Sequence, residues 1–249
     1  MIGQIESELS PRVRVLGIPI DDLSMDATVK RIVEFIESGR PHIVITADSS
    51  GIVEAHRDSE FFEIFQSADL VTADSVGVLW AAKRMGKPLH ERVSGVDIYA
   101  KLCQLSAERG YKIFLIGAAP GVAEIAAERC RLLFPGLNIV GARHGYFPTE
   151  SDEIVAQEIA ETHPDILVVA MGMPRQEKFI RHTQDIIRAP VAIGVGGTLD
   201  VFSGRIHRAP RWIQKLKLEW FYRLLQNPKK FAKVRNLPIF VRMILRSRA

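Results

Sequence analysis

The chain alternates between short runs of apolar, β-branched residues and longer segments in which apolar residues recur at helical spacing. The short runs are bounded by turn residues and predict strands at 12–20, 42–46, 70–72, 112–117, 138–141, 165–172 and 190–196. The longer segments predict helices near 25–38, 49–66, 76–85, 96–109, 120–133, 150–162 and 175–188. This alternation predicts an α/β fold with a mainly parallel sheet.

One predicted strand indicates where the middle of the sheet lies. The run 165–172 is apolar throughout, as expected of a strand covered by helices on both faces, so we place it at the centre. In such sheets ligands bind beyond the carboxyl ends of the strands. The residues just after the strands are therefore the first candidates for a site: Thr46, Asp74, Gly117, Gly172 and Gly196.

The charge of the chain is unevenly distributed. Its net charge is +4, but residues 205–249 hold 13 Lys or Arg and one acidic residue, which leaves residues 1–204 with a net charge of −8. We therefore divide the chain into an α/β core, 1–204, and a basic C-terminal appendage, 205–249. A basic segment of this kind favours polyanionic partners.

Aromatic and aliphatic residues are interleaved with the cations of the appendage. They include Trp212, Trp220 and Tyr222, and the segment 237–246 is apolar with two Arg. This pattern is typical of a helical element that lies on a membrane surface. Two alternatives remain open: helices packed on their own core with a solvated basic rim, and a nucleic-acid-binding tail.

Composition places the protein in the cytoplasm. No apolar stretch reaches the roughly 18 residues that a membrane span needs, and residues 1–14 lack a hydrophobic signal core. Cys103 and Cys130 have neither a CxxC spacing nor neighbouring His, so we expect two reduced thiols in the core.

Several familiar motifs are missing from the sequence. There is no GxxxxGK[ST], and Gly194-Val-Gly-Gly-Thr-Leu199 lacks the third glycine of a dinucleotide-binding fingerprint. HExxH and D-x-D are also absent, and the seven His are scattered. These absences weigh against kinases, dehydrogenases and metal-dependent enzymes, and we expect neither a metal nor a cofactor.

Two glycine-rich turns follow predicted strands. The first is Gly117-Ala-Ala-Pro-Gly121, and the second is Gly194-Val-Gly-Gly197. Backbone N–H groups at such helix starts bind phosphate, although glycine in these turns often serves only close packing.

Polar side chains end two other strands. Asp48 and Asp74 suit helix N-caps, and each also suits a general base for a hydroxyl nucleophile. Arg92 is either a surface cation or a clamp for phosphate. Arg175 and Gln176 follow the central strand, where we expect them to project over the ligand edge or simply to begin a helix.

Together these segments resemble the bacterial WecG/TagA/CpsF glycosyltransferase family over about residues 13–236. The motifs that carry the resemblance are TADSVGV (72–78), ERVSGVD (91–97), FLIGAAPGVAE (114–124), GYF (145–147), PDILVVAMGMPRQE (164–177), GVGGTLD (194–200), RAPRW (208–212) and LEWFYR (218–223). Their number and order make chance agreement remote.

The resemblance implies a Rossmann-like core with a C-terminal appendage that associates with the membrane. It also implies inverting, metal-independent transfer of a sugar, usually of the N-acetylmannosamine type, from a UDP donor to a polyprenyl-diphosphate-linked acceptor during cell-surface polysaccharide synthesis. Such an enzyme would act at the cytoplasmic face of the membrane. Two alternatives are a nucleotide-sugar-binding protein without turnover and the same chemistry with another hexose. The oligomeric state stays open, with a homo-oligomer as one possibility.

By the same resemblance, each site residue receives an expected role. Asp74 matches the general base, Thr46 a polar partner, Arg92 a cation for diphosphate or acceptor, and Gln176 a donor contact. The remaining groups for the diphosphate are Gly117, Gly196, Arg208 and Arg211.

The chain departs from the family pattern at two positions. Asp48 stands where members usually have Asn, and Ser75 stands where Gly usually follows the base. We expect Asp48 to disfavour an anionic donor and Ser75 to strain a turn that prefers glycine.

Overall fold

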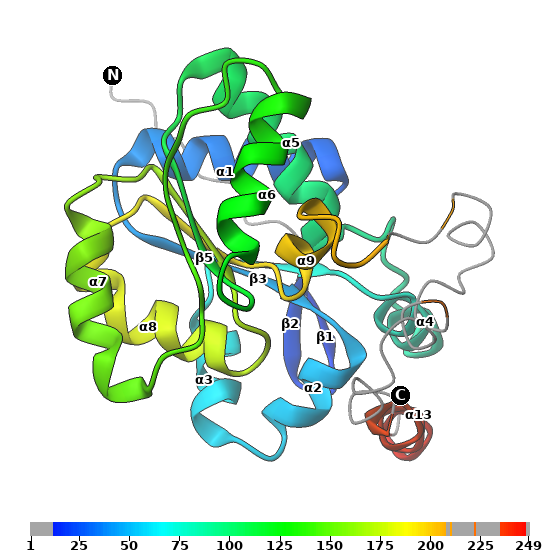
Figure 1. Ribbon diagram of the computed structural model, residues 1–249. Coiled ribbons are helices and arrows are strands. Elements are labelled where there is room, and N and C mark those ends of the chain that lie inside the picture. The colour runs from blue at the N-terminus through cyan, green and yellow to red at the C-terminus, as the bar shows by residue number, and fades with distance from the viewer. Residues whose placement is uncertain (1–11, 208–209, 211–221, 223–234, 248–249) are drawn as a thin grey trace, which may run out of the picture.

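The computed structural model describes residues 12–207, Pro210, Tyr222 and 235–247. Its main sheet is built from β3 (His42–Ala47), β4 (Leu70–Ala73), β5 (Ile113–Gly117), β6 (Ile139–Arg143), β7 (Ile166–Ala170) and β8 (Val191–Gly194). These six strands are all parallel and lie in the order β4-β3-β8-β7-β5-β6 (Figure 1). The predicted α/β fold with a parallel sheet is confirmed.

Strand β7 lies between β8 and β5, and all five of its residues are buried. Its uninterrupted apolar sequence follows from this position, because helices cover both of its faces. The prediction that this segment forms the centre of the sheet is confirmed.

Helices cover the sheet on both faces (Figure 1). One hydrophobic core joins the sheet to α1 (Met25–Ser38), α5 (Gly95–Arg109), α6 (Val122–Leu133) and α9 (Thr198–Phe202). The other joins it to α2 (Ser49–Ala55), α3 (Ser59–Ser67), α4 (Val76–Arg84), α7 (Asp152–Ala160), α8 (Arg175–Ile187) and α13 (Asn236–Arg246), with a 3₁₀ turn at Thr149–Ser151 before α7. Cys103 and Cys130 are buried, unbridged thiols in the first core, as predicted.

The segment expected to form one strand at 12–20 is instead a hairpin. Strands β1 (Arg12–Val15) and β2 (Ile18–Asp21) pair antiparallel and form a separate two-stranded sheet. Leu16 and Gly17 both have positive φ, 51° and 80°, as a type I′ turn requires. The apolar residues continue through this turn, so the hydrophobic pattern did not predict the turn.

The helix expected at 49–66 is two helices. Helix α2 ends at Ala55, and α3 begins at Ser59 after Asp58, whose side chain accepts a hydrogen bond from the Phe61 N–H. Asp58 is the N-cap of a second helix. The apolar spacing continues across the break, so the pattern predicted a single helix.

Most of the predicted appendage, 205–249, lies outside the described residues, so the division at 204/205 stays a prediction. Its described helix, α13, packs on α2 and buries Phe240 and Ile244 in the core of the protein. Its Asn236 donates a hydrogen bond to the Ser50 hydroxyl at 3.0 Å. Among the residues that the structure describes, no helix has the length and apolar character needed to cross a bilayer.

Candidate active site

Because the strands are parallel, their carboxyl ends meet at one edge of the sheet. Thr46 pairs with Thr72 across β3 and β4, and Asp74 follows β4 directly. Gly117 ends β5, and Gly196 follows β8. The order of connections reverses between β5 and β7, since β5 is followed by α6 on one face and β7 by α8 on the other. In open parallel sheets, ligands bind beyond the strand ends at such a reversal, so this edge is the candidate site.

Asp74 does not cap the helix that follows it. Ser75 is the N-cap of α4, and its hydroxyl accepts a hydrogen bond from the Val78 N–H. The Asp74 N–H donates to the Ala47 carbonyl at 2.9 Å, which ties the residue to the end of β3. The half-buried Asp74 carboxylate is therefore placed at the edge of the sheet without the capping role that its position suggested.

Ser75 occupies extended backbone, with φ −120° and ψ 149°, a region open to every L-residue. Its hydroxyl also accepts a hydrogen bond from the Ser49 N–H at 3.2 Å and lies 3.1 Å from the Ser49 hydroxyl. The expected strain from a side chain at this turn is thus absent, and Ser75 joins the starts of α2 and α4. Asp48, in contrast, acts as the N-cap of α2, accepting from the Gly51 N–H at 2.6 Å.

The Thr46 side chain is buried and acts within the sheet. Its hydroxyl donates to the Gly194 carbonyl at 2.8 Å, which links β3 to β8. Gly95, the first residue of α5, packs so closely that an added Cβ would lie 3.3 Å from the Thr46 hydroxyl. The start of α5 therefore lies directly on the carboxyl ends of β3 and β8.

Arg92 belongs to a segment that runs along the end of β4. The Val93 N–H donates to the Ala73 carbonyl at 2.9 Å, and the Thr72 hydroxyl donates to the Val93 carbonyl at 3.0 Å. These bonds bring Arg92 and Asp74 to the same strand end. The Arg92 guanidinium also lies 3.9 Å from the Asp97 carboxylate in the first turn of α5.

The two glycine-rich turns need glycine for different reasons: close packing at Gly117 and backbone conformation at Gly196. At Gly117, with φ 141°, an added Cβ would lie 2.4 Å from the Ala170 backbone, so close packing of β5 on β7 requires glycine there. At Gly196, with φ 56°, no atom lies within 4 Å of an added Cβ. Helix α6 begins at Val122 after the N-cap Gly121, which provides no side-chain cap. The Val122 N–H donates to the Ala119 carbonyl at 3.0 Å, so only the N–H groups that follow it in the first turn are candidates for binding an anion.

Of the two alternatives for the residues after β7, the structure shows the helix start, because Arg175 is the first residue of α8. Arg175 does not project over the ligand edge: its guanidinium forms a bidentate pair with Asp152 and lies against the rings of Phe147 and Phe179. Gln176 is fully buried, and its side-chain oxygen accepts hydrogen bonds from two backbone N–H groups. Arg208 and Arg211 lie outside the described residues.

Two residues of the site escaped the sequence interpretation. Ser94 caps α5 and donates to the Asp97 carboxylate at 2.5 Å, and the spacing of these two residues, S-x-x-D, is a capping signature that was available in the sequence. Glu177 is a fully buried carboxylate next to Gln176. Nothing in its sequence context separates it from an ordinary acidic residue of a first helical turn.

Shifted pKa values occur in a buried thiol pair and in a surface ion cluster. The hydrogen bond to Cys130, together with burial, raises the pKa of Cys103. On the surface, the Lys178 ammonium lies 2.7 Å from Asp58 and 2.8 Å from Glu60. It lowers the pKa of both carboxyl groups, first through the hydrogen bonds that it donates to them.

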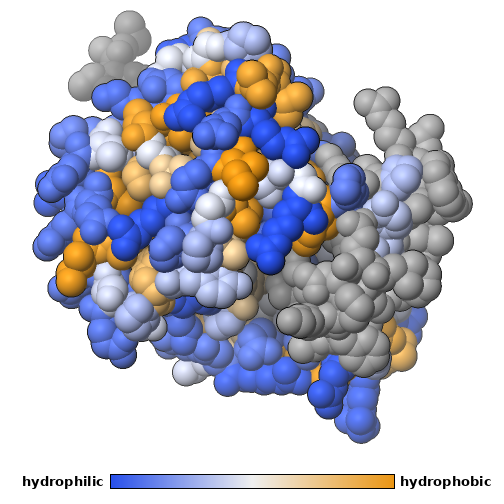
Figure 2. Space-filling view, in the orientation of Figure 1, coloured by the Kyte–Doolittle hydropathy of each residue, from blue (hydrophilic) through white to orange (hydrophobic). Residues whose placement is uncertain are grey.

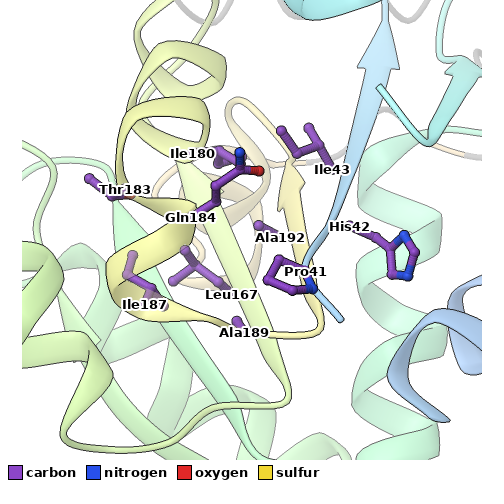
Figure 3. Close-up of a pocket in the computed structure, with 10 residues that line it drawn as sticks. All are labelled: Pro41, His42, Ile43, Leu167, Ile180, Thr183, Gln184, Ile187, Ala189 and Ala192. Carbon is purple, nitrogen blue, oxygen red and sulfur yellow. The ribbon is translucent and has the colours of Figure 1, made fainter. Parts of the chain in front are cut away.

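A small pocket lies at the opposite end of the sheet, against the last turns of α8 (Figure 3). It is lined at the strand starts by His42, Leu167 and Ala192, and on the helix by residues such as Ile180 and Thr183. Its ten lining residues include no carboxylate, so this pocket lacks the groups that the carboxyl edge brings together.

Comparison with known proteins agrees with this architecture. The model of the glycosyl transferase WecG/TagA/CpsF family matches residues 13–249. The chain is 34% identical over 212 residues to an N-acetylglucosaminyldiphosphoundecaprenol N-acetyl-beta-D-mannosaminyltransferase of Bacillus spizizenii, covering 85% of this chain and 82% of that protein. A protein of the same name from Staphylococcus aureus strain MW2 is 31% identical over 245 residues, covering 98% and 96% of the two chains. The resemblance inferred from the motifs is confirmed, and the chain belongs to the WecG/TagA/CpsF family of glycosyltransferases.

Proposed function

We propose that the protein transfers an N-acetylmannosamine-type sugar from a UDP donor to a polyprenyl-diphosphate-linked N-acetylglucosamine. The names of both relatives describe an N-acetyl-beta-D-mannosaminyl transfer, with N-acetylglucosaminyldiphosphoundecaprenol as the other named molecule. The observation that carries the proposal is that Asp74 and the segment of Arg92 lie together at the end of β4, on the same edge of the sheet as the glycine turns at Gly117 and Gly196.

The proposed reaction is a single inverting displacement. The acceptor hydroxyl oxygen forms a bond to the anomeric carbon as the bond from that carbon to the UDP oxygen breaks. In this proposal Asp74 takes the hydroxyl proton, because an aspartate, with a pKa of about 3.9 in free peptides, is ordinarily ionised at neutral pH. The UDP leaves with the bonding electrons and an increased negative charge.

That charge requires positive partners, which we assign without a metal ion. Arg92 and the uncapped N–H groups at the start of α6 are the described candidates. We expect Arg208 and Arg211 to add to them, although both lie outside the described residues. Gly196 leaves open space at its turn, which lets a phosphate approach the backbone.

The donor is identified by measuring UDP release. Purified protein is offered a panel of UDP-sugars with a short polyprenyl-diphosphate N-acetylglucosamine acceptor, in EDTA. We expect acceptor-dependent release with UDP-N-acetylmannosamine and little with its uronic acid, because Asp48 lies near the site. Release that requires an added divalent cation would contradict the metal-independent mechanism, and donor binding without release would favour the alternative of a nucleotide-sugar-binding protein.

We further infer that the protein works at the cytoplasmic membrane surface, where a lipid-linked acceptor resides. The support is the exposed side of α13, where Arg242 and Arg246 lie alongside Ile239 and Leu245, with Arg235 exposed just before the helix. Cations beside aliphatic side chains suit an anionic lipid surface.

Flotation with liposomes tests this inference. We expect the protein to float with anionic but not with neutral liposomes, and Arg242→Glu/Arg246→Glu to weaken the interaction. Equal binding to RNA and to anionic lipid would instead point to a general polyanion site. Sedimentation of the same samples reports whether the protein is a homo-oligomer.

A further inference from the structure

Two fully buried polar side chains meet at the start of α8. Gln176 and Glu177 are both 0% exposed, and the Gln176 amide nitrogen donates to the Glu177 carboxylate at 2.7 Å. Buried amide and carboxylate groups are costly unless hydrogen bonds satisfy them. We therefore ask which neighbouring groups these two side chains bind beneath the carboxyl edge.

The Gln176 side-chain oxygen connects two turns. It accepts hydrogen bonds from the Gly172 N–H at 3.1 Å and from the Gly196 N–H at 3.0 Å. Gly172 follows β7 and Gly196 follows β8, so one oxygen atom sets the spacing between the turns of two neighbouring strands.

Glu177 determines which way the Gln176 amide points. The two glycine N–H groups are donors, and they require the oxygen of the amide rather than its NH₂ group. In that orientation the NH₂ group needs an acceptor of its own, which the Glu177 carboxylate provides. The carboxylate thus stabilises the one amide orientation that holds both turns.

Gly172 and Gly196 both border open space, and a third glycine, Gly194, leaves room for the Gln176 and Glu177 side chains. Gly172 and Gly196 have φ 82° and 56°, and no atom lies within 4 Å of an added Cβ at either. At Gly194 an added Cβ would lie 2.6 Å from the Gln176 amide nitrogen and 3.0 Å from the Glu177 carboxylate. The backbone that Gln176 holds therefore borders open space at the edge where the substrate is expected.

We propose that Glu177 is a positioning residue for the donor site, acting through Gln176 on the turns at Gly172 and Gly196. In this arrangement Gln176 serves the donor through the backbone that it holds rather than by touching the sugar. The link to donor binding rests on the function proposed above, whereas the effect on the two turns does not.

The test compares Glu177→Met with Glu177→Gln. The two replacements are similar in size, but methionine has no strong acceptor, whereas glutamine keeps an acceptor oxygen for the Gln176 amide. In protein labelled with ¹⁵N-glycine, we expect Glu177→Met to shift the Gly172 and Gly196 amide signals and to speed their hydrogen exchange about tenfold. Glu177→Gln should stay close to wild type, and Gly110, at the far end of α5, is an internal reference.

Kinetics supply the second measurement. We expect Glu177→Met to raise the donor KM and to lower kcat/KM for the donor by about 100-fold, with the acceptor KM unchanged. A purely structural defect would reduce the fraction of protein that is folded and active. The apparent kcat would then fall, while the KM values for donor and acceptor would not change. If Glu177→Met does not fold, Gln176→Glu replaces it: two facing carboxylates should disturb both glycines, and Gln176→Glu/Glu177→Gln should restore them.

Unchanged Gly172 and Gly196 signals in Glu177→Met, together with an unchanged donor KM, would overturn the proposal. Failure of the proposed function is distinguishable, because it would appear as absent turnover in the wild type. The glycine signals would still report on the positioning in that case.

Discussion

Asp74 and Ser75 are adjacent in the chain but have separate tasks. Ser75 caps α4 and joins it to Ser49, which leaves Asp74 at the end of β4 beside the segment that carries Arg92. The sequence suggested both an N-cap and a base for the aspartate and could not choose between them. Because Ser75 is the N-cap of α4, Asp74 does not have the capping role, and its role as a base stays a proposal.

Removing the Ser75 hydroxyl should weaken the start of α4. We expect Ser75→Ala to lower the free energy of unfolding by about 1 kcal/mol, and Ser75→Gly to cost less, because glycine is tolerated better than alanine at an N-cap. Urea unfolding of the two variants beside the wild type measures both values. A more stable Ser75→Gly would show that the side chain strains this turn after all.

The sequence did not predict that the Gln176 side chain is buried. Its motif and its place after the central strand were evident, and a contact with the ligand was the natural expectation. Its burial depends on two glycine N–H groups from turns 24 residues apart in the chain, at 172 and 196, and no local pattern reports such a meeting.

At the scale of elements, a surface ion cluster joins α3 to α8. The Lys178 ammonium contacts Asp58 and Glu60, and Glu60 also lies 2.6 Å from the His182 imidazole. Lys178 lowers the pKa of both carboxyl groups, and they in turn raise the pKa of Lys178. The cluster is partly exposed, so screening limits its contribution.

The cluster predicts a pH-dependent stability difference between wild type and Lys178→Met. The carboxyl pKa values lie below their ordinary values of 3.8 and 4.5, so the stabilisation is fully present above those values and is lost as the pH falls through the folded-state pKa values. We expect Lys178→Met to cost about 0.5 to 1 kcal/mol at pH 7, with the difference shrinking below about pH 4. Urea unfolding at several pH values measures it, and a constant difference would contradict the assignment.

Helix α13 has two faces with different partners. One face buries Phe240 and Ile244 against the core near α2, and the other exposes cations and aliphatic side chains. The sequence offered packing on a core and contact with lipid as alternatives for segment 237–246. The packing is observed, and contact of the other face with lipid stays a proposal.

Truncating the buried face should destabilise the protein. We expect Phe240→Ala to lower the free energy of unfolding by about 3 to 5 kcal/mol, as for other fully buried phenylalanines. Leu245→Ala, at a position 56% exposed, is the matched control and should cost less than about 0.5 kcal/mol. Equal effects in chemical unfolding would mean that α13 is not part of the cooperative core.

At the scale of the whole molecule, the periodic pattern was sufficient to predict the parallel sheet and its central strand. It failed where the chain reverses without changing its apolar pattern, at Leu16-Gly17 and between Ala55 and Ser59. Those reversals depend on backbone conformation and a single N-cap. On the coloured part of the face in Figure 2, hydrophilic and hydrophobic side chains are intermixed.

The carboxyl edge of the sheet holds candidate residues from distant parts of the chain, and Asp74 is the proposed base. The most direct test compares acceptor-dependent UDP release by the wild type and by Asp74→Asn, with donor binding measured on the same samples. We expect release to fall by at least about 100-fold while the donor still binds, because an amide cannot take the hydroxyl proton. Wild-type rates of release in Asp74→Asn would remove Asp74 from the reaction.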